Sequence, residues 1–184
     1  MILTGPEIEK MVAERRIRID TFRKEHVNTN SYDVRLGGKY LVYSDQIIDP
    51  RVPAEHQIFD IPADGLCMQP GQFLLAETEE RVGSDHFVPI LHAKSGTARS
   101  GLFVHITADL IDIGSFGKIT LQLYATLPVR IFPGQRIAQV SFWKPHGEIR
   151  LYAGKYQGSD GPRPSLTYKD FEPAALAVAS TENA

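Results

Sequence analysis

The chain has 184 residues, of which 42% are hydrophobic and 23% charged, and its formal net charge is −2. This length predicts one domain with a sizeable core, and the near-neutral charge argues against a polymeric nucleic-acid partner. One cysteine excludes an intrachain disulfide. No apolar run reaches the length of a membrane span, and no signal-peptide pattern opens the chain. We therefore expect a cytoplasmic protein without membrane contact.

The first predicted element is a helix near the N-terminus. Thr4 and Glu7 have the spacing of a capping box, and Pro6 suits the first helical turn. An apolar face continues to Val12, so the helix is expected to end near Arg16.

Short strands are predicted for the rest of the chain. Alternating or apolar runs between glycine and proline turns place them at residues 31–37, 39–44, 70–80, 101–108, 117–125, 127–132, 136–143 and 147–154. The first two strands should be separated by a turn at Gly37-Gly38. The pattern favours a mainly β barrel or sandwich, with one domain over residues 1–172 and a flexible tail over 173–184.

Four polar features could carry chemistry. The segment "KSGTARSG" (94–101) combines small residues, hydroxyls and Arg99, which suits a phosphate but also a plain turn or helix start. Asp112 could orient a water molecule or fix an Asx turn. Gln122 could recognise a base edge, but an amide cannot act as a general base. The glycine-rich segment "GKYQGSDGPRPS" (154–165) could close over a triphosphate or form a surface loop. The sequence lacks the ligand spacing of a zinc deaminase.

In their order and spacing, these motifs resemble the dCTP deaminase family of the dUTPase superfamily. The similarity covers roughly residues 1 to 170, through "MILTGPEI", "NSYDVRLG", "PGQFLLAETEE", "KSGTARSGLFVHITADLIDIG", "GKITLQLY", "PGQRIAQVSF" and "GKYQGSDGPRPS". It implies a distorted β-barrel or jelly-roll of the dUTPase-like type. It also implies a homotrimer with active sites between subunits, and Mg²⁺ bound through the triphosphate of dCTP or dUTP.

The resemblance also implies residue roles. Ser95 would polarise a water molecule or the base, Arg99 would contact phosphate and the catalytic group, and Asp112 would lie near the deoxyribose or orient the attacking water. The substrate-binding positions that it implies are Lys94, Gly96, Thr97, Ala98, His105, Thr107, Ala108, Thr120, Leu121, Gln139, Tyr152, Lys155, Gln157 and Ser159.

Three positions depart from the family pattern. Where dCTP deaminases carry "ITLE", with a glutamate that shuttles protons at cytosine C4, this chain has "ITLQ", which places Gln122 at the catalytic position. Gly96 replaces a second serine, and Ile113 replaces a proline. Gln122 could therefore mark a disabled deaminase, natural or engineered, or a different reaction.

Three functions follow from these observations. The first is a dCTP deaminase that converts dCTP and water to dUTP and ammonia, and so serves dUTP biosynthesis. The alternatives are a dUTP or dNTP diphosphatase that uses Asp112 and magnesium, and a non-catalytic deoxynucleotide-binding protein. The preferred base stays open, because a glutamine amide can flip to suit either cytosine or uracil.

Overall fold

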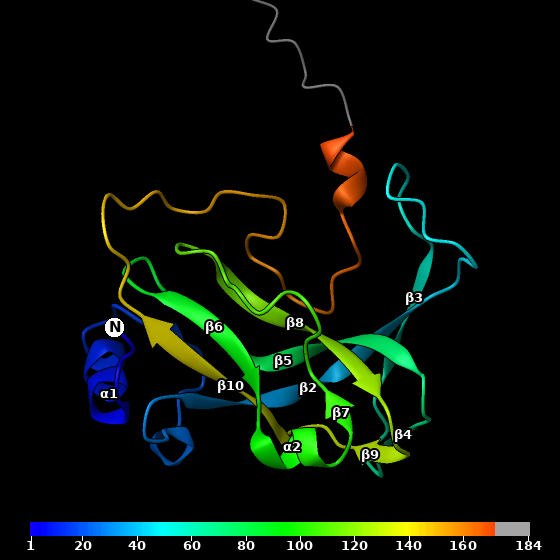
Figure 1. Ribbon diagram of the computed structural model, residues 1–184, viewed down its shortest axis with the longest axis horizontal. Helices are drawn as coiled ribbons and strands as arrows, with labels where there is room; N and C mark the ends of the chain where they lie inside the picture. The colour runs from blue at the N-terminus through cyan, green and yellow to red at the C-terminus, as the bar shows by residue number, and fades with distance from the viewer. Residues whose placement is uncertain (172–184) are drawn as a thin grey trace, which may run out of the picture.

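Ten β-strands dominate the computed structural model, which describes residues 1–171 (Figure 1). They are β1 (Arg18–Ile19), β2 (Tyr32–Tyr43), β3 (His56–Asp60), β4 (Leu66–Met68), β5 (Phe73–Gly83), β6 (Val88–Ala93), β7 (Leu102–Phe103), β8 (Phe116–Ala125), β9 (Val129–Ile131) and β10 (Arg136–Trp143). The helices are α1 (Gly5–Ala13), α2 (Ser95–Arg99) and the 3₁₀ helices η1 (Lys24–His26) and η2 (Thr167–Asp170). This confirms the mainly β class with a short N-terminal helix. The tail predicted at 173–184 lies outside the described residues.

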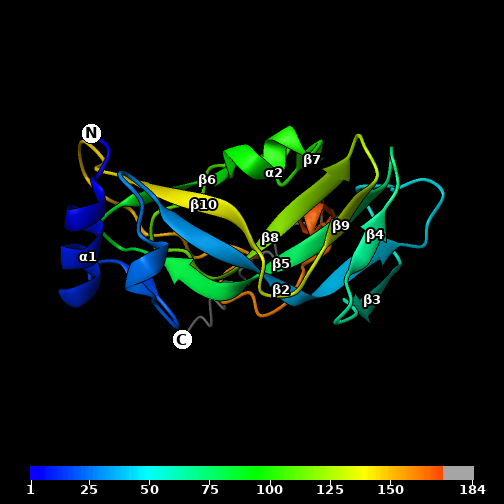
Figure 2. The same ribbon diagram turned by 90° about the horizontal axis from the view of Figure 1, so that it is seen from below.

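All strand pairings are antiparallel, and most strands join one curved sheet in the order β6–β10–β2–β5–β8–β7. β1 also pairs with β5, β3 pairs with β2, and β4 and β9 form a separate two-stranded ribbon. The sheet curls into a nearly closed barrel, with α1 at one end of the long axis and β3 and β4 at the other (Figure 2). Among residues 1–171, no helix is long and apolar enough to cross a membrane.

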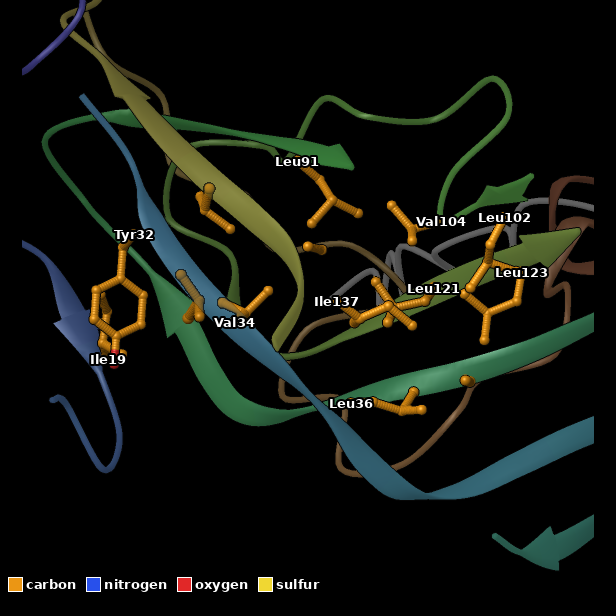
Figure 3. Close-up of a cluster of buried hydrophobic side chains, with 14 of the residues drawn as sticks. Ile19, Tyr32, Val34, Leu36, Leu91, Leu102, Val104, Leu121, Leu123 and Ile137 are labelled. Atoms are coloured by element: carbon orange, nitrogen blue, oxygen red, sulfur yellow. The ribbon is translucent and has the colours of Figure 1, made fainter. Parts of the chain in front are cut away.

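The hydrophobic core fills the inside of this curved sheet (Figure 3). Leu121 and Leu123 of β8 are fully buried there, together with Leu36 of β2 and Ile137 of β10. Side chains alternate between the two faces of a strand, so the inward direction of Leu121 and Leu123 turns Gln122 to the opposite face of β8. The predicted alternation of this strand is confirmed.

The N-terminal helix is shorter than predicted. Thr4 is the N-cap residue in an extended conformation, but its side chain makes no capping hydrogen bond, so the expected capping box is wrong. The helix ends at Ala13, because Arg15 takes a left-handed conformation with φ of 60° and the chain cannot continue as a right-handed helix to Arg16.

The turn predicted at Gly37-Gly38 is also wrong, because β2 runs through both glycines. The pairing of β2 with β5 shifts register between Leu36 and Tyr40, as at a β-bulge. A Cβ atom on Gly37 would lie only 2.6 Å from Cγ of Glu77. The first glycine therefore serves the close approach of two strands rather than a chain reversal.

Two further strand predictions fail, at 101–108 and 147–154. In the first, only Leu102–Phe103 pairs as a strand, because the backbone N–H of Ile106 donates to the Gln122 side chain instead of joining a ladder. The second contains no strand; its apolar residues Ile149 and Leu151 are exposed, so its alternating pattern does not reflect a buried face. The strands β1, β3, β4 and β6 were not predicted.

Candidate functional site

A pocket of about 460 Å³ opens on the outer face of β8. Its walls come from β5 and β8, from the loop that precedes β8, and from residues 152–165, which we call the covering segment. Figure 1 shows the chain after β10 arching over β8 before it reaches η2. Six of the predicted site residues line this pocket: Ala108, Asp112, Thr120, Gln122, Tyr152 and Ser159.

The Gln122 side chain is fixed in one orientation by the loop beside it. Its backbone N–H donates to the carbonyl oxygen of Val104 at 2.9 Å. Its side-chain Oε1 accepts the backbone N–H of Ile106 at 3.1 Å. A backbone N–H can only donate, so the carbonyl end of the amide must face Ile106. The amino group of the amide makes no hydrogen bond within residues 1–171.

Asp112 lies in the tight turn that leads into β8. The N–H of Ser115 donates to the carbonyl oxygen of Asp112 at 3.0 Å, and Gly114 supplies the positive φ of 90° that closes the turn. The carboxylate is exposed, and no partner for it occurs in the described part of the chain. It is the only carboxylate among the lining residues of the pocket, which also include no histidine.

The covering segment is tied to the turn and strand beneath it. Oε1 of Gln157 accepts the N–H of Phe116 at 2.8 Å, and its Nε2 donates to the carbonyl oxygen of Gly114 at 2.8 Å. The hydroxyl of Thr120 accepts the N–H of Arg163 at 3.1 Å. Gln157 was predicted to hold substrate; here its amide orders the loops around the pocket.

Tyr43 adds a further attachment of this segment, and Tyr152 and Ser159 make hydrogen bonds within it. The Tyr43 hydroxyl accepts the N–H of Ser165 at 2.8 Å, and burial raises the pKa of Tyr43. The Tyr152 hydroxyl accepts the N–H of Tyr156 at 3.0 Å. Ser159 is buried and donates its hydroxyl to the carbonyl oxygen of Tyr156 at 2.8 Å. The covering segment is therefore held chiefly through its backbone.

Lys155 does not line the pocket. Its ammonium forms an ion pair with Asp170 of η2, with Nζ–Oδ1 and Nζ–Oδ2 distances of 2.6 and 2.5 Å. The hydrogen bond to Asp170 is the main cause of the raised pKa of Lys155.

Two other predicted residues belong to a separate polar network, which we call the Asp33 cluster: Asn28, Ser31, Asp33, Lys94, Arg136 and Gln139. Lys94 forms an ion pair with the buried carboxylate of Asp33. The Gln139 amide accepts the hydroxyl of Ser31 at 2.7 Å and donates to the carbonyl oxygen of Ala93 at 3.2 Å. These contacts use the polar groups that substrate binding would require.

The remaining predicted residues lie outside both the pocket lining and the Asp33 cluster. Ser95, Gly96, Thr97, Ala98 and Arg99 form α2, which Figure 1 shows on the side of the barrel opposite the covering segment. Leu121 points into the core. Thr107 is exposed, and His105 keeps its Nδ1 buried without a hydrogen-bond partner among residues 1–171.

Six polar pocket residues were not named as site residues from the sequence: Tyr43, Ser115, Lys118, Tyr156, Arg163 and Ser165. Lys118 could have been found, because it precedes Thr120 and Gln122 at the two-residue spacing of one strand face. Arg163 lies inside the glycine-rich segment that was already a candidate. No sequence pattern near Tyr43 indicates a site residue, because Tyr43 meets the covering segment only through its hydrogen bond with the distant Ser165.

Comparison with known families decides the relationship. Residues 2–145 match the model of the dCTP deaminase-like family. The chain belongs to this family.

Curated dCTP deaminase-like relatives are similar over nearly their whole length. The chain is 41% identical over 173 residues to "dCTP deaminase, dUMP-forming" of Clostridium beijerinckii, covering 94% of this chain and 99% of the relative. A relative of the same name from Leptospira biflexa is also 41% identical, with the same coverage, and one from Cytophaga hutchinsonii is 38% identical over 94% and 99%. These names give dUMP as the product, which conflicts with the dUTP expected from the sequence.

The fold is also similar to a solved dCTP deaminase. The crystal structure of 2′-deoxycytidine 5′-triphosphate deaminase from Agrobacterium tumefaciens aligns with a TM-score of 0.63 and 20% sequence identity. The alignment covers 79% of this chain and 48% of that chain. At this identity the likeness shows the fold.

Proposed function

We propose that this chain hydrolyses a pyrimidine deoxynucleoside triphosphate to the monophosphate and diphosphate. Asp112 carries the proposal, because it is the only carboxylate that lines the pocket and it has no partner within residues 1–171. A free carboxylate can orient a water molecule and accept its proton. The water oxygen would bond to the α-phosphorus, the bond from that phosphorus to the bridging oxygen would break, and diphosphate would leave.

Deamination places a demand on the site that Gln122 does not meet. Attack of water at cytosine C4 needs a group that takes a proton from water and gives it to the departing amine. Gln122 has no suitable pKa, and its carbonyl oxygen already accepts the N–H of Ile106. The relatives' name, dUMP-forming, implies loss of both the amino group and diphosphate. We propose that this chain keeps the second of these steps.

The triphosphate would lie under the covering segment. Arg163 lines the pocket with a cationic group, and Tyr152 adds a hydroxyl. Lys118 also lines the pocket and would exchange its ion pair with Glu77 for phosphate. Lys155 would join them when it exchanges Asp170 for phosphate. No group of three or more histidine, cysteine or acidic side chains suited to a metal occurs among residues 1–171. We propose that magnesium enters with the nucleotide as part of the substrate, where it would neutralise phosphate charge.

We further propose a homotrimer in which α2 completes the pocket of a neighbouring copy. Ser95 and Arg99 are exposed, lie outside the pocket of their own chain, and form no side-chain hydrogen bond or ion pair within the described residues. They are free to contact a second subunit, as the family resemblance implies.

The deciding experiment measures both products. The purified protein is incubated with magnesium and each deoxynucleoside triphosphate, including dUTP, and ammonia and diphosphate are quantified separately. We expect diphosphate without ammonia. Ammonia from dCTP would contradict the proposal and support the second candidate, the complete dUMP-forming reaction, which the name of the 41% identical relatives favours. If neither product forms, the proposed hydrolysis is wrong, and titration with each nucleotide then tests whether the chain only binds nucleotides.

A further inference from the structure

We propose that Gln122 makes the pocket selective for a pyrimidine with a carbonyl group at C4, of the uracil type, and unfavourable for cytosine. This inference rests on the proposed function, because it assumes that the pocket holds a pyrimidine deoxynucleotide. It goes beyond that function by assigning the base and the residue that selects it.

The first step is the orientation of the amide. The Ile106 N–H donates to Oε1 of Gln122 at 3.1 Å, and a flipped amide would set two donors against each other at this distance. Gln122 is also held through its backbone, which donates to Val104 at 2.9 Å. The choice between amide oxygen and nitrogen is therefore made by the protein before any ligand binds.

The second step is what the fixed amide offers the pocket. Gln122 is half-buried and lines the pocket beside Leu75 and Ala108, two residues whose side chains have no polar atoms. With Oε1 occupied, Nε2 is left as a hydrogen-bond donor, and no acceptor for it occurs within residues 1–171. A ligand group that faces Gln122 must accept a hydrogen bond, or the donor stays unsatisfied.

The third step compares the two bases. Uracil carries a carbonyl acceptor at C4, so an amide donor that faces C4 meets an acceptor there. Cytosine carries an amino donor at C4, and two opposed donors lose a hydrogen bond on each side. A glutamate at this position could still accept from Ile106 with one oxygen, but its other oxygen would present an acceptor. Gln122 therefore presents a hydrogen-bond donor to the pocket where a glutamate would present an acceptor.

Binding measurements on non-hydrolysable nucleotides test this selectivity without relying on turnover. Calorimetric titration with the α,β-imido analogues of dUTP and dCTP, each with magnesium, should show the uracil analogue binding about tenfold more tightly. The Gln122→Glu variant should lose or reverse this ratio, because it keeps the shape and changes donor to acceptor. The Gln122→Met variant should bind both analogues equally, since methionine offers neither group. Gln69→Glu, the same change at an exposed turn outside the pocket, should leave the ratio unchanged.

The outcomes separate the base assignment from the hydrolysis. Equal binding of the two analogues, or tighter binding of the cytosine analogue, would overturn the selectivity and leave diphosphate release untouched. The same ratio in Gln122→Glu as in the unmodified chain would also overturn it. If neither analogue binds, the proposed function fails and the selectivity fails with it. Thermal unfolding of each variant, followed by circular dichroism, confirms that the compared proteins are folded.

Discussion

The pocket and the Asp33 cluster contain the same kinds of polar residues but use them differently. In the Asp33 cluster, Asp33 accepts the amide of Asn28 at 2.7 Å as well as the ammonium of Lys94, and both ends of the Gln139 amide are bonded. In the pocket, Gln122 keeps a free amino group and Asp112 a free carboxylate within the described chain. Polar groups that satisfy one another hold the barrel together, and groups left unsatisfied at a cavity are available to a ligand.

Among the variants that test this difference, Asp112→Asn should have the largest effect, which is on the rate of diphosphate release. Amide in place of carboxylate removes the proposed proton acceptor, so diphosphate release should fall by about 10²–10⁴-fold. The free energy of unfolding should change by less than about 0.5 kcal/mol, because the side chain is exposed and unpaired. Steady-state diphosphate assays and urea titrations measure the two quantities. Full activity of this variant would remove Asp112 from the reaction.

Asp33→Ala, in contrast to Asp112→Asn, should act chiefly on the free energy of unfolding. The Asp33 side chain is only 1% exposed, and its loss would leave Lys94 without its partner in a partly buried position. We expect the free energy of unfolding to fall by about 3 kcal/mol, as for other broken buried ion pairs. Urea titration measures the loss. Asp60→Ala is the matched control, because Asp60 is 82% exposed and pairs with the exposed Lys39, and it should cause a much smaller loss. Equal losses would show that the Asp33 cluster does not stabilise the fold.

The smallest effect is expected at His92 of β6, whose register partner on β10 is Gln139. Its Nε2 lies 2.8 Å from the Ser141 hydroxyl; burial lowers the pKa of His92, and the nearby charge of His105 lowers this pKa further, against an opposing effect of Asp109. In the unfolded chain the pKa is about 6.5. Below that pH the unfolded state binds the proton more readily, so stability falls as pH falls through about 6.5 toward the lower folded pKa.

The test of this pH dependence compares three proteins. Between about pH 7 and pH 5, His92→Gln should lose less stability than the unmodified chain, as measured by urea titration at each pH. His86→Gln replaces an exposed histidine and should follow the unmodified chain. If His92→Gln and His86→Gln have the same pH profile, protonation of His92 does not contribute to the loss.

Local pattern predicted the fold where strands are buried on one face and bounded by turns. The strand predicted at 136–143 coincides with β10, because Ile137, Ala138 and Val140 are buried and a Pro-Gly turn precedes them. The pattern failed at Gly37-Gly38, where the decisive contact comes from Glu77, forty residues away. It failed again at 147–154, where the chain forms no strand and only Tyr152 lines the pocket.

The sequence predicted the kinds of residue in the candidate site, but only some of the predicted residues line the pocket. The ordered motifs identified Asp112 and Gln122, and both line the pocket. The same motifs also named Lys94 and Gln139, because sequence alone does not show whether a cation or an amide contacts a ligand or other groups of the protein. The orientation of the Gln122 amide depends on the placement of Ile106 and could not be inferred from the strand alone.

The attachment of the covering segment has a consequence for how the protein is made. All ten strands among the described residues lie before Lys144, whereas the pocket also needs Tyr152, Ser159 and Arg163. During synthesis from the N-terminus, every strand of the barrel leaves the ribosome before the pocket can close. The pocket is therefore completed late, after every strand of the barrel has been synthesised.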